Sequence, residues 1–239
     1  MHTSNEAFSE TQGTNPGSPS NLANDAHIKI KNAIIRHEIK GGEKVSEQRL
    51  VERFALTKAA TRTAIKRLIA DGLMTAESPK TTIVTPLTLA GVRSVFQARN
   101  ILEPEAAKLA AGKVDPTSLQ KLNERCRAGY RFGDGEQEFA FLTANRNFHL
   151  EIARSSQNSF LSDFISQLHD HAMRILWISL KIENRAEVWQ HGHEDIIEAL
   201  LSGDSFGAGV TALTHLQSGQ RLVYEILSSS NNFGDIQLG

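Results

Sequence analysis

The pattern of apolar and polar residues between Val45 and Leu73 predicts two short helices joined by a tight turn. Ser46 and Thr57 are the expected N-caps, because a side-chain hydroxyl can accept the free N–H groups of a first helical turn, and Gly72 suits the end of the second helix. Apolar residues recur at helical spacing on one face of each predicted helix: Leu50, Val51 and Phe54 in the first, then Ala64, Ile65, Leu68 and Ile69 in the second.

The opposite face of the second predicted helix is basic. Lys58, Arg62 and Lys66 recur every fourth residue. Such a row of cations is expected where a helix enters the major groove of DNA between phosphates, although a solvated basic face is common on its own. Residues 25–85 carry 12 Lys and Arg against 7 Asp and Glu, a balance of +5, which leaves −6 for the rest of a chain whose net charge is −1. This asymmetry favours DNA as the partner of the basic segment.

The flanking segments predict a winged helix-turn-helix over residues 25–86. Residues 25–40 have the apolar spacing of a supporting helix, and residues 74–84, with β-branched residues on both sides of Ser78-Pro79, predict a two-stranded hairpin. Residues 1–24 contain few bulky apolar side chains and are expected to form a disordered tail.

Beyond Pro86 the pattern is helical and predicts an antiparallel bundle of about six helices over residues 87–229. The remaining residues, 230–239, are expected to form a C-terminal tail. The predicted fold is therefore mostly α, a winged helix-turn-helix followed by an all-helical domain. The expected helices of the bundle cover residues 89–111, 115 to about 133, 136–154, 160–181, 186–201 and 204–227.

Composition narrows the class of protein. At 239 residues the chain is long enough for two domains of common size, and it has no run of 18 or more apolar residues, so no membrane-spanning helix is expected. The N-terminus lacks the basic and apolar regions of a secretory signal, and the single Cys126 cannot form an internal disulfide. Together these features favour a reducing cytoplasm.

Histidines in three predicted helices of the bundle form a candidate metal site. Asn145 and His149 lie four residues apart, hence one above the other on one helix face, while His193 and His215 belong to two other helices. Three imidazoles and an oxygen ligand suit a divalent transition ion such as Zn²⁺, Ni²⁺ or Mn²⁺. The chain has nine histidines, so a surface or core role for these three is an open alternative.

The order and spacing of residues 26–86 resemble the N-terminal domain of the GntR family of bacterial transcription regulators. The matching residues are Val45-Ser46-Glu47, Leu50, Thr57-Lys58, Arg62, Ala64, Leu68 and Asp71-Gly72-Leu73. Two features differ from the family pattern: Thr57-Lys58-Ala59-Ala60 replaces Ser-Arg-Thr-Pro, and the glycine expected near Thr81 is missing. Lys58 is a point charge where the family has a guanidinium fork, so Arg62 is expected to carry the largest share of binding. The resemblance implies that DNA is contacted by Arg49, Lys58, Ala59, Arg62, Lys66, Ser78 and Lys80.

Residues 90–227 resemble the effector-binding (FCD-type) domain of the FadR-type subgroup of that family, in which an Asp and three His often hold a metal ion. The resemblance implies Asn145, His149, His193 and His215 as ligands, with Asn145 where Asp is typical. A neutral amide is a poorer ligand and leaves the ion more positive, which favours an anionic partner. A small carboxylate metabolite is therefore expected as effector, with Arg99 as a second anchor by bidentate pairing.

One alternative to these expectations stays open at the level of residues. Arg99 is equally suited to an i,i+4 ion pair with Glu103.

The long apolar stripe of residues 89–111 can serve both a core and a partner, and homodimers suit palindromic operators, so a homodimer is expected. Within the resembled family a repressor is the commoner mode.

Other classes of function explain less of the chain. His169-Asp170, with His149 and Asp195, is similar to the metal-dependent HD-type phosphohydrolases, which are also all-helical, but that interpretation leaves residues 45–84 unexplained. The chain has no Ser or Cys nucleophile motif and no glycine-rich phosphate loop. Ala59, Ala60 and Thr81 keep a third interpretation open, a ligand-binding module that has lost operator binding. The sequence favours a ligand-responsive transcription regulator that is not an enzyme.

Overall fold

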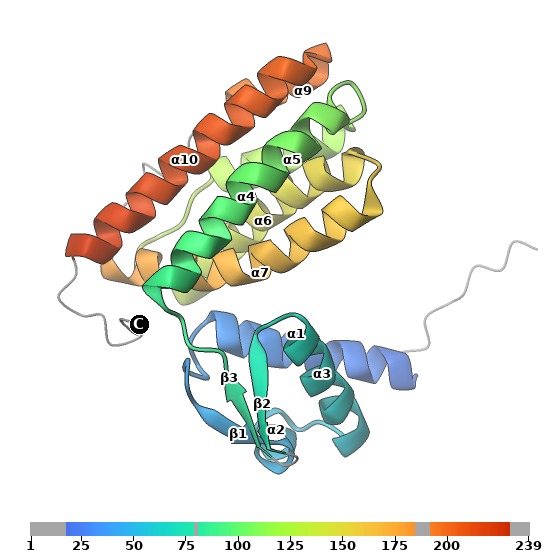
Figure 1. Cartoon of the computed structure of the whole chain (residues 1–239), viewed down its shortest axis with the longest axis vertical. Coiled ribbons are helices and arrows are strands. Elements are labelled where there is room, and N and C mark those ends of the chain that lie inside the picture. Colours follow the sequence, from blue (N-terminus) through green and yellow to red (C-terminus); the bar gives the residue numbers. More distant parts are fainter. Residues whose placement is uncertain (1–17, 79–80, 185–191, 230–239) are drawn as a thin grey trace, which may run out of the picture.

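The computed structural model describes residues 18–78, 81–184 and 192–229. Its helices and strands form two parts along the long axis of the molecule, a winged helix-turn-helix at one end and a helical bundle at the other (Figure 1). The predicted fold class is confirmed. None of the described helices is long and apolar enough to cross a membrane.

The winged helix-turn-helix combines three helices with a three-stranded antiparallel sheet in the order β1-β3-β2. Its helices pack around an apolar core that includes Ile30, Leu50 and Leu68. The elements are α1 (Pro19–Ile35), β1 (Lys44–Ser46), α2 (Glu47–Phe54), α3 (Lys58–Ala70), β2 (Met74–Ser78) and β3 (Thr81–Val84).

Both predicted N-caps of the helix-turn-helix are confirmed. The side chain of Ser46 accepts the N–H of Arg49 at 3.2 Å, and that of Thr57 accepts the N–H of Ala60 at 3.2 Å. Ala55 closes α2 in the left-handed conformation, with φ of 51°. These local bonds satisfy backbone donors that each helix start would otherwise leave free, and they fix the turn between α2 and α3.

The N-terminal part of the domain departs from the sequence prediction in two ways. Helix α1 begins at Pro19, so residues 19–24 of the expected tail are helical; Ser18 caps the helix and Ala23 is buried. The expectation rested on bulky apolar residues and missed a face built from alanines. Strand β1 was also not predicted, because three residues are too few for a pattern, and its pairing of Val45 with Thr82 joins distant segments.

The bundle contains six described helices, in agreement with the prediction. Residues 186–191 of the fifth expected helix lie outside the described residues, as do residues 1–17 and 230–239 of the expected tails; Gly192 and His193 precede α9 rather than belonging to a helix. Apolar periodicity does not mark where a helix begins, so the prediction placed these two residues inside a helix. The elements are α4 (Leu89–Ala110), α5 (Pro116–Arg127), α6 (Gly135–Ser155), α7 (Ser159–Ile182), α9 (Glu194–Ser202) and α10 (Ser205–Ser229).

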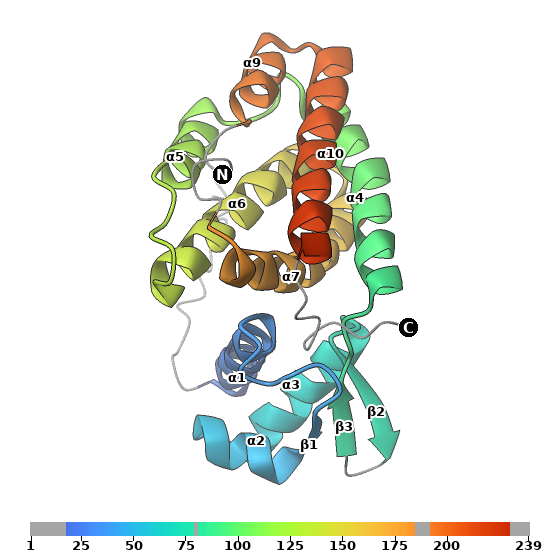
Figure 2. The same cartoon turned by 90° about the vertical axis from the view of Figure 1, so that its left-hand side faces the viewer.

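Helix α7 of the bundle packs against the winged helix-turn-helix and lies across α1 (Figure 2). Lys31 Nζ on α1 lies 2.8 Å from Asp170 Oδ2, and His171 Nε2 lies 2.8 Å from the carbonyl oxygen of Asp71. One turn further, Arg174 Nη1 donates to the carbonyl oxygen of Thr85 at 2.8 Å. One face of α7 is therefore tied by polar contacts to α1, to the end of α3 and to the segment that links the two parts.

Candidate nucleic-acid interface and metal centre

Helix α3 presents a basic face to solvent. Ala64 and Leu68 are buried in the domain core, while Lys58, Arg62 and Lys66 are exposed on the other side. The predicted division of α3 into a packing face and a free face is therefore what the fold adopts. Ala59 and Thr63 lie on the same exposed face.

A groove of about 660 Å³ lies between α3, the start of α2 and the strands β2 and β3. Four of the predicted DNA contacts line it: Lys58, Arg62, Lys66 and Ser78. Arg49 is exposed on α2 but is not among the lining residues, and its Nη2 lies 3.2 Å from Glu43 Oε1. Lys80 lies outside the described residues.

Arg62 is paired with Glu47, a contact that the sequence did not predict. Its Nε and Nη2 atoms donate to Glu47 Oε2 and Oε1 at 2.9 and 3.1 Å, a two-pronged pair at the groove. The Arg62 guanidinium lowers the pKa of the Glu47 carboxyl from its ordinary value. Glu47 thus occupies the same donor fork that a phosphate or a guanine edge would use.

The three predicted histidine ligands meet in the bundle. His149 projects from α6, His193 immediately precedes α9, and His215 lies in the middle of α10. Their candidate ligand atoms all lie within 4.8 Å of one another, which suits a single ion bound by three imidazoles. The sequence spacing could not show this meeting, because α6, the start of α9 and α10 bring the rings together only in the fold.

The protonation state of two of these rings, those of His193 and His215, also suits a metal ion. Burial, reinforced by the neighbouring imidazoles, lowers the pKa of His193 well below its ordinary value and that of His215 to about 3. His193 and His215 are therefore neutral at physiological pH, the form that binds a metal. The Nε2 atoms of His149 and His193 are buried and have no hydrogen-bond partner among the described residues. Buried unpaired nitrogens are costly, so the residues present fit a bound ion.

A buried carboxylate orients His149. Glu103 Oε2 lies 2.8 Å from His149 Nδ1, and Glu103 Oε1 lies 3.2 Å from His169 Nε2 and accepts a hydrogen bond from Arg99 Nε at 2.6 Å. Burial alone would raise the pKa of Glu103, but Arg99, His169 and His149 together hold it well below its ordinary value. A carboxylate beside Nδ1 favours the tautomer that leaves Nε2 free to bind a metal.

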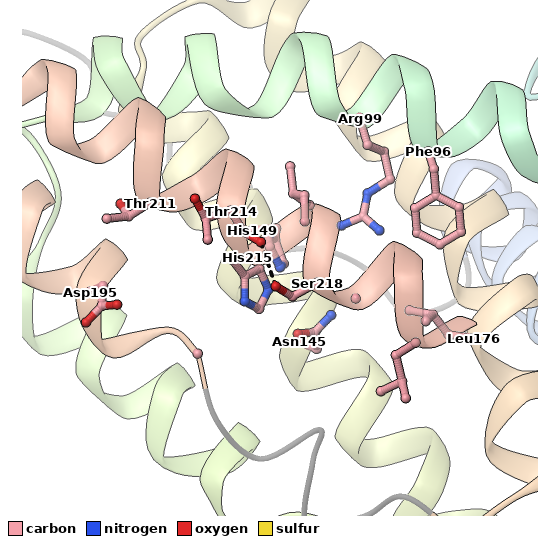
Figure 3. A pocket seen from close by; sticks show the side chains of 14 residues that line it. Phe96, Arg99, Asn145, His149, Leu176, Asp195, Thr211, Thr214, His215 and Ser218 are labelled. Atoms are coloured by element: carbon pink, nitrogen blue, oxygen red, sulfur yellow. Dashed lines mark hydrogen bonds between the residues drawn. The ribbon is translucent and has the colours of Figure 1, made fainter. Parts of the chain in front are cut away.

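His149 and His215 border a cavity of about 380 Å³ whose other lining residues include Asn145, Arg99 and Asp195. Asn145, the predicted oxygen ligand, lies one helical turn before His149 (Figure 3). The Nε of Arg99 pairs with Glu103, as the ion-pair interpretation expects. The side chain also lines the cavity, and its role as an effector anchor stays a prediction. Asp195 was considered only for the hydrolase alternative, and nothing in its local sequence placed it at this cavity.

The residue pair of the hydrolase alternative is divided between two environments. His169 faces Glu103 inside the bundle, whereas Asp170 is held between Lys31 and Arg146, with Arg146 Nε 3.0 Å from Asp170 Oδ1. Among the described residues, Asp170 belongs to no cluster of metal-ligating side chains. The two neighbours therefore do not form the joint ligand set of a hydrolase.

Comparisons with known proteins agree with both parts of the fold. LutR, a transcriptional regulator of Bacillus subtilis, is 28% identical over 206 residues, covering 75% of this chain and 90% of LutR. YdhC of the same organism is 25% identical over 189 residues, 78% of this chain and 84% of YdhC, and the repressor RspR of Escherichia coli is 23% identical over 224 residues, 94% and 97%.

Solved structures share the fold. McbR/YncC of E. coli superposes with a TM-score of 0.73 at 22% identity, covering 85% of this chain and 97% of that protein. A regulator from Rhodococcus sp. RHA1 superposes with a TM-score of 0.65 at 18% identity, 89% and 100% covered. The family model for bacterial regulatory proteins of the gntR family matches residues 22–84, and the model for the FCD domain matches residues 94–218, more than half of the chain. The protein therefore belongs to the GntR family of transcription regulators and carries an FCD effector-binding domain.

Proposed function

We propose that this regulator binds a palindromic operator through the groove beside α3, as a homodimer, and that a small carboxylate in the histidine cavity controls this binding. The observation that carries the proposal is the exposed row of Lys58, Arg62 and Lys66 along that groove. On DNA the two lysines would contact phosphates as point charges, and the Arg62 fork would take a phosphate or a guanine edge after exchanging Glu47 for it.

The cavity is proposed to hold a divalent transition metal ion, such as Zn²⁺, Ni²⁺ or Mn²⁺, on His149, His193, His215 and Asn145. The neutral rings of His193 and His215, the unpaired Nε2 atoms and the carboxylate behind His149 support this assignment. A bound ion would supply Lewis acidity toward a carboxylate. Arg99, buried with its Nε already on Glu103, would hold the same carboxylate through its terminal nitrogens.

Helix α7 offers a physical route from the cavity to the DNA-binding part. His169 lies beside Glu103, the carboxylate that orients His149. The next residue, Asp170, pairs with both Lys31 of α1 and Arg146 of α6. Arg146 directly follows Asn145, which lines the cavity. An effector that changes the position of α6 or α7 would therefore change the ion pair that ties α1 to the bundle. Control follows only if the effector binds one arrangement of the two parts more tightly than the other.

Exposed apolar side chains support the proposed homodimer. On α4, Ile101 is 67% exposed and Leu109 43%, and Phe160 at the start of α7 is 77% exposed. Such side chains are common on surfaces that another chain covers. A two-fold dimer would place two copies of α3 on the two halves of a palindrome. A repressor is proposed because RspR, a relative over nearly its whole length, is named as one.

DNA binding is tested by retrieving genomic fragments with the purified protein. The proposal expects a short palindrome to be enriched, with retention falling as salt rises, because counterions are released when phosphates are neutralised. Arg62→Ala should abolish enrichment, and Lys121→Ala, which removes an exposed cation on α5 of the bundle, should leave it unchanged. Equal enrichment by both variants would refute the assignment of α3.

Metal binding is tested by elemental analysis of the protein after dialysis. About one transition ion per chain is expected, as for a site with one set of three imidazoles. The double variant His149→Ala/His193→Ala should lose it. His171→Ala is the matched control, because that histidine contacts the backbone of Asp71 outside the cavity. A double variant that keeps its metal would refute the ligand set.

A further inference from the structure

The effector cavity has chemically different sides. Figure 3 shows Asp195 and Thr211 on one side, Arg99 and Phe96 on the other, and His149, His215 and Asn145 between them. A ligand that fills this cavity must therefore pair with a charged side chain, Arg99, and also pack against an apolar one, Phe96.

Arg99 carries the cavity's main unpaired hydrogen-bond donors. Its side chain is 4% exposed, and its Nε donates to Glu103. The two terminal nitrogens form no hydrogen bond with any described residue, and the guanidinium carbon lies 5.8 Å from the centre of the Phe96 ring. Arg99 is also the only Lys or Arg among the described residues that line the cavity. A planar anion is the partner that a buried fork of this kind pairs with best.

The hydroxyl groups around the cavity already donate their protons within the protein. Thr211, Thr214 and Ser218 of α10 all line it, but each donates its proton to a carbonyl oxygen of its own helix, at 2.9 Å in every case. Their donor capacity is used within α10. A ligand hydroxyl facing this helix would find few donors, and Asp195 at the far side would repel a second carboxylate.

The wall beside Arg99 is apolar. Phe96, Leu176, Leu216 and Leu222 line the cavity, and each is largely buried in the bundle. The part of a ligand that lies against them loses its water without gaining hydrogen bonds. Apolar groups gain from that transfer, whereas hydroxyl groups lose by it.

We propose that the effector is a monocarboxylate with an apolar body, a short aliphatic or aromatic acid, rather than a sugar acid or a di- or tricarboxylate. Its carboxylate would lie between Arg99 and the imidazoles, and its body against Phe96, Leu176 and Leu222. This inference rests on the proposed function of the cavity as the effector site.

The test is a series of ligand titrations measured by calorimetry. The full chain is used, without DNA, in buffer containing Zn²⁺. From acetate through butyrate to hexanoate, Kd should fall roughly fourfold for each added methylene, the gain expected for burying one CH₂ group. 3-Hydroxybutyrate should bind about tenfold more weakly than butyrate, because its hydroxyl is buried without a full set of partners. Hexanamide, gluconate and citrate should not compete with hexanoate.

Variants locate the ligand. Arg99→Lys should weaken hexanoate binding because it replaces the fork by a point charge. Leu176→Phe, which narrows the apolar side, should weaken hexanoate more than acetate, and Phe96→Leu should favour longer acids. Leu201→Asn, at an exposed residue of α9, is the control and should leave the series unchanged.

The outcomes separate this inference from the proposed function. Affinity that does not depend on chain length, tighter binding of 3-hydroxybutyrate or gluconate, binding of hexanamide equal to that of hexanoate, or no binding of any acid would overturn the inference. DNA enrichment that depends on Arg62 would still stand in each case. Conversely, an intact acid series with no DNA enrichment would uphold the cavity assignment and refute the regulator's operator contact.

Discussion

Replacing Glu103 by Gln tests the buried network that supports the metal site. Glu103 accepts or faces three groups: Arg99 at 2.6 Å, His149 at 2.8 Å and His169 at 3.2 Å. The variant keeps the size of the side chain and one carbonyl oxygen but removes the charge. Arg99 would then be a buried cation without an anionic partner.

Two separate losses follow from this change. Breaking a buried ion pair by removing one partner costs about 3–5 kcal/mol of folding free energy, and both Arg99 and Glu103 are 5% exposed or less. Losing the group that orients a ligating histidine weakens metal binding by about 10- to 100-fold. Glu105→Gln is the matched control on the same helix, because Glu105 pairs with Lys108 at the surface, where such pairs contribute little.

The pH dependence of stability gives a further check. The pKa of Glu103 is held well below its ordinary value of 4.5, so its contribution is fully present above about pH 4.5 and is lost as pH falls through the folded-state pKa. The assay covers the range from about pH 5 to pH 8 and more acidic solutions. The difference in unfolding free energy between wild type and Glu103→Gln should be constant over that range and should shrink in acid. Urea unfolding measures the stability and competition with a chelator measures the metal affinity. Equal values for Glu103→Gln and Glu105→Gln would refute the role of the network.

Three further changes test other parts of the molecule. Glu47→Gln should raise the affinity for non-specific DNA severalfold in a low-salt anisotropy titration, because it frees the Arg62 fork and removes a negative charge; unchanged or weaker binding would contradict this. Asp170→Asn should reduce the effect of hexanoate on operator affinity, from a coupling of roughly fivefold or more to near none; an intact response would remove α7 from the route. Gly192→Ala should weaken metal binding about tenfold, because the added Cβ would lie 3.0 Å from a histidine ring of the cavity. Gly133→Ala controls for the backbone, since it also has positive φ but no neighbour within 4 Å.

Much of the winged helix-turn-helix could be predicted from the sequence because its signals are local. Ser46, Thr57 and the apolar face of α3 act within one or two turns of their own helices. The short strand β1 could not be predicted, since it exists only through pairing with β3, and the early start of α1 depends on small buried residues such as Ala23. Tertiary contacts decided both.

The candidate metal site shows the same division. His149, His193 and His215 were found because histidine is rare enough to be noticed and the family resemblance narrowed the choice. The roles of Glu103 and His169 behind His149 escaped prediction, because they come from α4 and α7 and meet only through the packing of the bundle. The partner of Arg62 was missed for a similar reason, since Glu47 lies on the preceding helix.

The claim that the exposed cations of α3 lie against DNA phosphates is tested most directly by the salt dependence of operator affinity. We expect the plot of log Kd against log salt concentration for Lys66→Ala to be shallower than that of wild type by about one unit of slope, as for the loss of one phosphate contact. The control Lys121→Ala should keep the wild-type slope. A Lys66→Ala slope equal to that of wild type would contradict the account.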